Sequence, residues 1–152
     1  MSPDVFTAEG IDQAYAAIAG RVGAHSMEVV EVTIVPGVLT IEAIDPNAPI
    51  EPNQWQYTSG VVGPSRPVDY GDDVEALRQN LFPVDDVPAV NITAAVGAAV
   101  AASGIADGAV GSLSITRNLP FDTNIVMFIN VQGERSSKQV RADVTGQITE
   151  VV

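Results

Sequence analysis

The sequence predicts an α+β protein made of two tandem units, each a helix followed by antiparallel strands. Two stretches, beginning near residues 7 and 91, carry apolar residues at the spacing of an amphipathic helix. Segments in which apolar and polar residues alternate follow each of them, as expected of half-buried strands. Short turns join these segments, which favours antiparallel pairing over parallel strands with crossover helices.

The first predicted element is a helix over residues 7–22. Thr7 can act as its N-cap, and Gly23 is a natural C-terminal stop. Its apolar face is formed by Ile11, Tyr15, Ile18 and Val22. Residues 28–35 and 38–44 then alternate on either side of Pro36-Gly37, which predicts a β-hairpin with a tight turn.

A proline-rich stretch follows this hairpin. Residues 45–52 carry three prolines and predict a loop, and residues 54–58 predict a short strand. On that strand Trp55 and Tyr57 share one face. They are the candidate binding residues, because Trp and Tyr are enriched at interface hot spots. The alternative interpretation is that both aromatic rings pack in the core.

The segment between the units, residues 70–85, is too apolar for a flexible linker. Asp72-Asp73 can open a short helix, along which Val74, Leu77 and Leu81 are helically spaced. Since such side chains gain about 1.5–3 kcal/mol each on burial, we expect the segment to pack against both units. The predicted division is residues 1–69, the linker at 70–85, and residues 86–152.

The second unit repeats the order of the first. A helix over roughly residues 91–102 has Asn91 as its expected cap, an apolar stripe of Ile92, Val96 and Val100, and a stop at Gly104. Strands are predicted at 109–117, 124–132, 138–145 and 147–151. Because residue identity between the halves is weak, the predicted repeat is one of architecture.

Composition excludes several classes of function. The formal net charge of −12 disfavours binding to nucleic acid and to anionic membrane surfaces, and it favours a basic protein as partner. The absence of Cys excludes disulfides, thiol nucleophiles and iron–sulfur clusters. No apolar run approaches the ~20 residues that span a bilayer, so we expect no direct membrane insertion. The N-terminus has no signal-peptide pattern.

No constellation of residues predicts catalysis, a metal or a cofactor. His25 is the single His and has no neighbours at ligand spacing. Asp72-Asp73 and Asp85-Asp86 precede apolar stripes, where carboxylates stabilise helix N-termini. Asn91-Ile92-Thr93 matches a glycosylation pattern, but Asn91 is also well placed as a cap. We therefore predict a protein that is not an enzyme.

Several short motifs resemble those of bacterial extracytoplasmic proteins of unknown function. They are Gln54 to Gly60, Gly63-Pro64 with Pro67-Val68, Leu81 to Val87, and the closing region from Val126 to Ile148. These proteins resemble tandem PepSY-like or cystatin-like repeats of the beta-lactamase-inhibitor type. The resemblance implies such a repeat fold and a place in the periplasm or on the cell surface, with anchoring through a lipid or a segment absent here. It carries no catalytic residue.

The sequence thus favours a non-enzymatic, extracytoplasmic protein-binding or inhibitory module. Its expected surface is the sheet face that the helices leave open, because antiparallel sheets can expose one face. A structural or assembly domain of a larger cell-envelope protein is the first alternative, and a small hydrolase is the second. A binding module should expose an apolar or aromatic patch, a structural domain none, and an enzyme a deep polar pocket.

Overall fold

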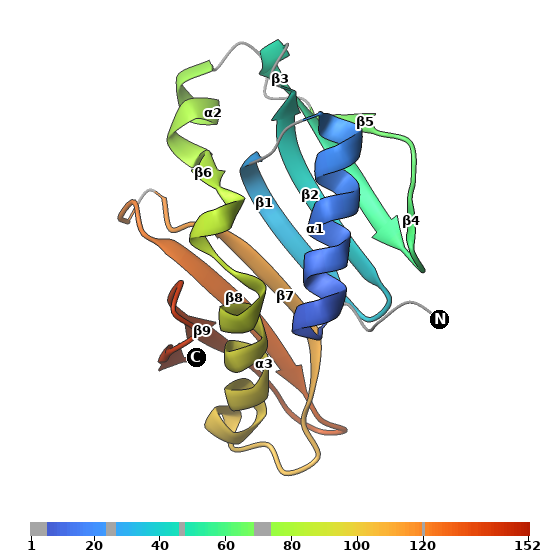
Figure 1. Cartoon of the computed structure of the whole chain (residues 1–152). Coiled ribbons are helices and arrows are strands. Elements are labelled where there is room, and N and C mark those ends of the chain that lie inside the picture. Colours follow the sequence, from blue (N-terminus) through green and yellow to red (C-terminus); the bar gives the residue numbers. More distant parts are fainter. Residues whose placement is uncertain (1–5, 24–26, 46–47, 69–73, 120) are drawn as a thin grey trace.

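The computed structural model describes residues 6–23, 27–45, 48–68, 74–119 and 121–152, and its fold is α+β, as predicted. One antiparallel sheet forms a layer, and two long helices lie side by side across one of its faces (Figure 1). In chain order the elements are α1 (Ala8–Val22), β1 (Glu28–Val35), β2 (Val38–Asp45), β3 (Ala48–Thr58), β4 (Val61–Val62), β5 (Arg66–Pro67), α2 (Val74–Asn80), β6 (Phe82–Pro83), the 3-10 helix η1 (Val84–Asp86), α3 (Ala89–Ser103), β7 (Ala109–Arg117), β8 (Ile125–Gln132), β9 (Ser137–Ala142) and β10 (Ile148–Val151).

The strands of both predicted units belong to one continuous sheet. Its strand order is β10-β9-β8-β7-β1-β2-β3-β4, with β5 paired to β3 and β6 to β1. The first strand of each half meets at the centre, where Val32 lies opposite Ile115 and Ile34 opposite Leu113. All four side chains are fully buried, and their pairing removes two strand edges that would otherwise be exposed.

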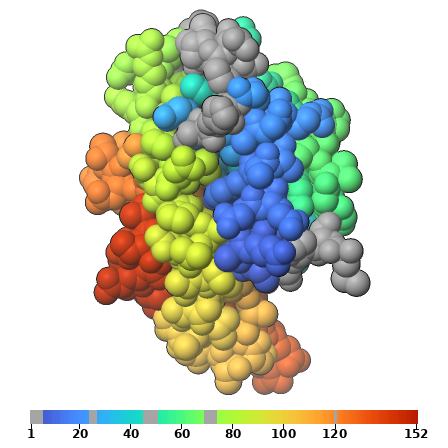
Figure 2. Space-filling model, viewed as in Figure 1, coloured from blue at the N-terminus to red at the C-terminus, as the bar shows by residue number. Residues whose placement is uncertain are grey.

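We call residues 6–68 the first half and residues 89–152 the second half. Each half begins with a 15-residue helix and continues with antiparallel strands. Figure 2 shows α1, in blue, and α3, in yellow, packed side by side over the sheet. That the two halves superpose as repeats stays a prediction.

Helix α1 follows its predicted pattern. The side chain of Thr7 accepts a hydrogen bond from the Gly10 amide at 3.1 Å, and Gly23 ends the helix in the left-handed conformation with φ 84°. The residues it buries are Gly10, Ile11, Ala14, Ile18 and Val22. Bulky side chains therefore separate α1 from the sheet.

Helix α3 differs from its prediction in its start and in its buried face. It begins at Ala89 behind Pro88, so Asn91 is not its cap; the Asn91 side-chain amide instead donates to the Val144 carbonyl at 2.9 Å. Val96 and Val100 are only half-buried. The buried face consists of Ala89, Ile92, Ala95, Ala99 and Ser103, which are mostly small and let the helix lie close to the sheet.

The predicted loop over residues 45–52 is wrong. Strand β2 runs to Asp45 and β3 begins at Ala48, so residues 48–52 are part of a strand. Pro52 lies opposite Ile44 beside a register irregularity, and its carbonyl accepts a hydrogen bond from the Val68 amide. Proline is tolerated here because the register irregularity interrupts the regular ladder with β2, and prolines within sheets are found at such bulges.

The segment between the halves packs against both, as expected from its apolar composition. Phe82 is fully buried and pairs with Val29 of β1. The Leu81 carbonyl accepts a hydrogen bond from the Arg117 guanidinium of the second half at 2.9 Å. Leu77 is buried and Leu81 half-buried. These contacts join the segment to the first half and to the second half. The predicted division at residues 69 and 85 stays a prediction.

The turn between β9 and β10 touches α3 with almost no space between them. Gly146 has φ 90°, and a Cβ placed on it would lie 2.4 Å from the Asn91 carbonyl oxygen. Only glycine satisfies both conditions. Together with the bond from Asn91 to Val144, this contact fixes the end of the sheet to the helix.

Candidate binding surface

One face of the sheet is not covered by either long helix. Strand residues alternate between faces, so those next to the buried core residues point away from α1 and α3. We call this surface the open face. Its residues in the main strands are Glu31, Thr33, Thr40, Glu42, Gln54, Gln56, Ser112, Ser114, Thr116, Val126, Phe128, Asn130, Gln139 and Arg141.

The open face is polar over most of its extent. A row of cross-strand neighbours crosses both halves: Gln56, Thr40, Thr33, Ser114, Phe128, Arg141 and Glu150. Among the described residues, the large hydrophobic side chains with high exposure lie at strand ends, in a loop, on β4 and on α3. The centre of the open face therefore lacks the contiguous apolar patch expected of a hydrophobic docking surface.

In the first half, two carboxylates face each other on this surface. Glu31 and Glu42 are direct cross-strand partners, and the Thr33 hydroxyl donates to Glu31 at 3.0 Å. Burial raises the pKa of Glu42, the charge of Glu31 raises it further, and a hydrogen bond from Gln54 partly offsets both. Like charges directly opposite each other destabilise a sheet. This arrangement therefore favours the approach of a cation.

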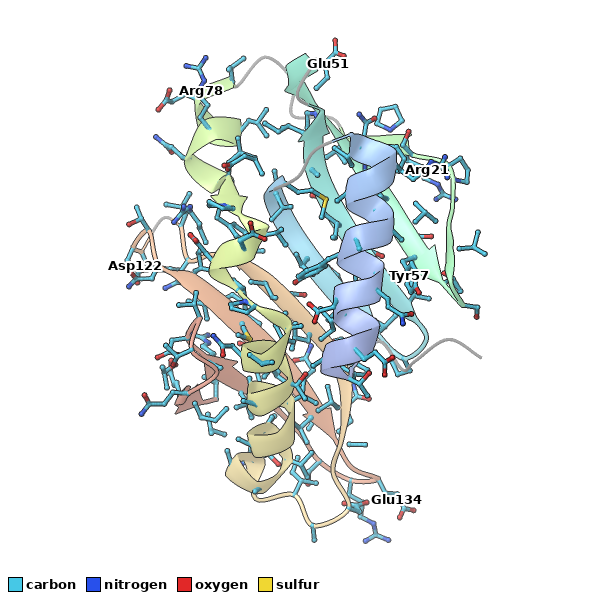
Figure 3. The ribbon with its side chains drawn as sticks, in the orientation of Figure 1. Arg21, Glu51, Tyr57, Arg78, Asp122 and Glu134 are labelled. Atoms are coloured by element: carbon cyan, nitrogen blue, oxygen red, sulfur yellow. The ribbon has the colours of Figure 1, made fainter. Side chains whose placement is uncertain are left out.

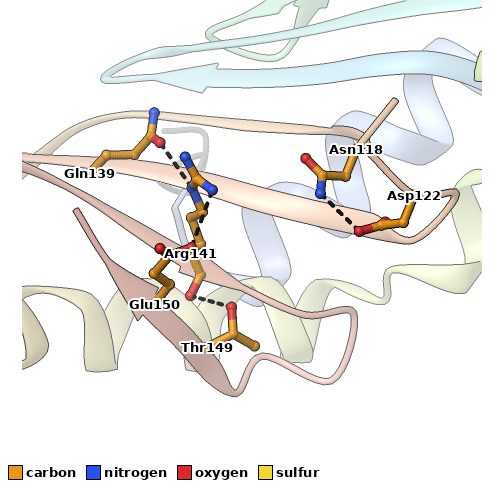
Figure 4. Close-up of polar contacts among 6 residues, drawn as sticks. All are labelled: Asn118, Asp122, Gln139, Arg141, Thr149 and Glu150. Carbon is orange, nitrogen blue, oxygen red and sulfur yellow. Dashed lines mark hydrogen bonds and ion pairs between the residues drawn. The ribbon is translucent and has the colours of Figure 1, made fainter. Parts of the chain in front are cut away.

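In the second half, the matching part of the open face is internally neutralised (Figure 4). The Arg141 guanidinium forms a salt bridge of 3.2 Å with Glu150 and donates from Nε to Gln139. It also lies over the ring of Phe128, 5.4 Å from the centroid. Three neighbouring strand residues thus hold the cation in one orientation.

A pocket of about 380 Å³ opens beside this cluster, where the β7–β8 loop approaches the end of β9 and β10. Its lining residues are Asn118, Asp122, Asn124, Ile125, Val126, Arg141, Ala142, Asp143, Val144, Thr149 and Glu150. Hydrogen bonds from Thr145 and Gln147 lower the pKa of Asp143, so this carboxylate is ionised at neutral pH. Charged groups and an apolar floor therefore meet in one concavity.

The predicted aromatic pair lies on the other face. Trp55 and Tyr57 are opposite the buried residues Ile41 and Leu39, so both point toward α1. Tyr57 is only 3 % exposed and belongs to the core (Figure 3). Trp55 is half-buried, with the Arg21 guanidinium 5.7 Å from its ring centroid. The core alternative describes Tyr57, and a binding role for the pair stays a prediction.

The other candidate residues do not assemble into a site. His25 and Asp72-Asp73 lie outside the described residues, and Asp85-Asp86 are exposed in η1. Within the described part of the chain, no three His, Cys, Asp or Glu residues are grouped to hold a metal ion. None of the described helices has both the length and the hydropathy to cross a membrane.

Sequence reasoning missed the Glu31–Glu42 pair, although the signal was present. A two-residue turn at Pro36-Gly37 pairs residue 35 with residue 38, and the same register pairs residue 31 with residue 42. The pocket gave no comparable signal, because its lining comes from three separate segments.

Comparison with known proteins supports the fold. Neither a family model nor a curated protein matches this sequence. Among solved structures, the chain is similar to a protein described as "a putative lipoprotein (CD1622) from Clostridium difficile 630". The two share 13% sequence identity with a TM-score of 0.65, over 93% of this chain and 91% of the other. At this identity the likeness shows a common fold.

Proposed function

We propose that this chain is a non-enzymatic, extracytoplasmic module that binds a basic protein through the open face of its sheet. The observation that carries the proposal is the Glu31–Glu42 pair, a half-buried like-charge contact on the face that neither α1 nor α3 covers. Natural proteins tend to keep such locally unfavourable arrangements at functional sites. A cationic group of a partner would relieve the repulsion.

Two further features support this role. The net charge of −12 steers basic partners toward the molecule and repels acidic ones. The similar fold of the protein described as "a putative lipoprotein", together with the motif resemblance to extracytoplasmic proteins, favours a location in the cell envelope. We propose that location for this chain as well.

The test is affinity capture from the cell-envelope fraction of the source organism. The variant carries Glu31→Gln and Glu42→Gln, which remove both charges and keep the size of the side chains. The matched control carries Glu75→Gln and Glu134→Gln, because these exposed carboxylates lie on α2 and in the β8–β9 turn. We expect the parent and the control to retain a basic protein that the variant loses.

Retention of the same protein by the Glu31/Glu42 variant would contradict binding through this face. Loss of the protein by both variants would show that total charge, and not the pair, attracts the partner. Calorimetry with the purified partner would then compare the dissociation constants at low and high salt, because contacts between exposed charges weaken with ionic strength.

A second candidate is a structural or assembly domain of a larger envelope protein. The polar character of the open face favours it, since a domain without a docking surface should expose no apolar patch. Failure of the parent protein to retain any specific partner would support this candidate over the first.

A further inference from the structure

The pocket of the second half adjoins the most exposed large hydrophobic side chain among the described residues. Phe121 is 84 % exposed and precedes Asp122, which lines the pocket. Backbone hydrogen bonds from Phe121 and Asp122 to the Asn118 carbonyl hold this loop in a tight turn. An exposed aromatic side chain next in sequence to a pocket residue is a candidate anchor for a partner, because aromatic residues are enriched at interfaces.

The charges in the pocket do not cancel. Arg141 is neutralised by Glu150, so the remaining formal charges are those of Asp122 and Asp143. Hydrogen bonds from Thr145 and Gln147 reach Oδ1 of the Asp143 carboxylate. Val126 and Val144 provide an apolar lining between these groups. The pocket thus combines a negative rim with a wall that suits a hydrocarbon chain.

We propose that this pocket receives a Lys or Arg side chain of the basic partner, with Phe121 contacting an apolar residue beside it. The inference rests on the proposed function and adds a specific subsite to it. The aliphatic stem of the incoming side chain packs on Val126 and Val144, and its cation lies against Asp122 and Asp143. Long cationic side chains commonly bury their stems and keep their charged heads at a polar rim.

Charge complementarity selects this occupant over two others. A second copy of the chain would bring a further net charge of −12 to a rim that is already negative. An anionic ligand would have to compete with Glu150 for Arg141 and would meet both aspartates. A basic segment gains from the same charges that disfavour the other occupants.

The pocket is tested with two small probes that have alkyl chains of similar length and opposite charges. n-Butylguanidinium and n-butyrate are titrated separately into isotope-labelled protein, and the NMR signals of the side-chain amides of Asn118 and Asn124 are followed. We expect saturable shifts with butylguanidinium and none with butyrate. Equal binding of both probes, or of neither, would overturn the proposal.

A variant with Asp122→Asn and Asp143→Asn removes the two charges. Asparagine keeps an Oδ1 acceptor at both positions, so the turn hydrogen bonds can be retained. Asp107→Asn is the matched control, since Asp107 is exposed and accepts a backbone hydrogen bond from Glu134, which lies at the opposite end of β8 from Asp122 (Figure 3). We expect about a fivefold weaker affinity for butylguanidinium in the double variant and no change in the control. An unchanged affinity in a folded double variant would refute the role of the rim.

The two proposals can fail separately. If a partner is captured in a Glu31/Glu42-dependent manner but butylguanidinium does not bind, the subsite is wrong and the proposed function stands. If butylguanidinium binds as expected but no partner is captured, the pocket retains its preference for cations and the proposed function is contradicted. For both to hold, the double variant must also weaken capture of the partner.

Discussion

The two halves share an order of elements but differ in how their helices meet the sheet. Helix α1 presents bulky residues such as Ile11 and Ile18, whereas α3 presents mainly alanines and meets Gly146 in direct backbone contact. The first contact is filled by side chains, and the second is set by the shape of the backbone. The second half should therefore tolerate less change at its helix contact than the first.

The two halves also differ in the charges on their open faces. Glu31 and Glu42 repel each other in the first half, whereas Arg141 and Glu150 attract each other in the second. A uniform scaffold thus carries one strained and one satisfied arrangement of charge. That difference is why we assign the attraction of a basic partner to the first half and a shaped subsite to the second.

The largest expected effect comes from the segment that joins the halves. Replacing Phe82 by Ala empties a fully buried position and should destabilise the chain by about 3–5 kcal/mol. Phe121→Ala is the control, because its ring is 84 % exposed and its loss should change the free energy of unfolding by less than about 0.5 kcal/mol. Denaturant unfolding is followed by the fluorescence of Trp55, in the first half, and by far-ultraviolet dichroism, which reports both halves.

The shape of these curves tests whether the comparison concerns two parts of one unit. Coincident transitions in the parent and in the Phe82 variant indicate that the halves unfold together. If the fluorescence transition of the variant moves to lower denaturant while part of the dichroism transition stays in place, the halves unfold independently. A binding surface shared between them would then lose its support.

A smaller effect is expected at the helix contact of the second half. Gly146→Ala should destabilise by roughly 1–3 kcal/mol from the positive φ alone, with a further cost from the contact with Asn91. Gly20→Ala in the first half is the matched change, because a Cβ there has no neighbour within 4 Å. It should stabilise α1 by about 0.5–1 kcal/mol. Thermal unfolding of both variants measures the contrast, and equal shifts would contradict it.

The contrast between α1 and α3 also explains which buried helix residues could be predicted from the sequence. The bulky stripe of α1 has a regular spacing and predicted the helix and three of its buried residues, Ile11, Ile18 and Val22, whereas Tyr15 is only partly buried. In α3, Val96 and Val100 suggested a face that the structure only half buries, because close approach to the sheet selects the small side chains of Ala95 and Ala99 instead. Hydrophobic periodicity draws attention to large apolar side chains. A helix that packs closely on a sheet instead needs small side chains at the contact.

The pairing of strands that are distant in the chain also could not be predicted from local sequence patterns. The joining of β1 to β7 and the three segments that form the pocket depend on contacts between residues far apart in the chain. Residues 48–52, predicted as part of a loop, form the start of β3 because pairing with β2 outweighs their local propensity. By contrast, the register of the β1–β2 hairpin follows from its turn, so the Glu31–Glu42 contact could have been predicted.

Glu42→Gln, unlike the substitutions of Phe82 and Gly146, is expected to increase the free energy of unfolding at neutral pH. The folded-state pKa of Glu42 is raised above the ordinary value of 4.5, mainly by burial, so folding is favoured more when this carboxyl is protonated. That contribution is present below the unfolded-state pKa and is lost as the pH rises through the folded-state pKa. The variant should therefore be more stable than the parent at neutral pH by about 0.2–1 kcal/mol. Thermal midpoints at pH 7 and below pH 4 test this, because the gain should disappear in acid.

The smallest effect, with the opposite sign, is expected from the same substitution in the second half. Glu150→Gln removes the salt bridge to Arg141. The side chain of Arg141 is 33% exposed and that of Glu150 is 56% exposed. Exposed pairs contribute little, so the loss at neutral pH should be about 0.5 kcal/mol or less. Arg141 keeps its contacts with Gln139 and Phe128, which limits the loss further. High salt should shrink this loss, because the pair is near solvent, whereas the gain at Glu42 should change less because it arises mainly from burial. If Glu150→Gln stabilised the protein as Glu42→Gln does, total negative charge would account for both effects, and the assignment of strained and satisfied charges to different halves would fail.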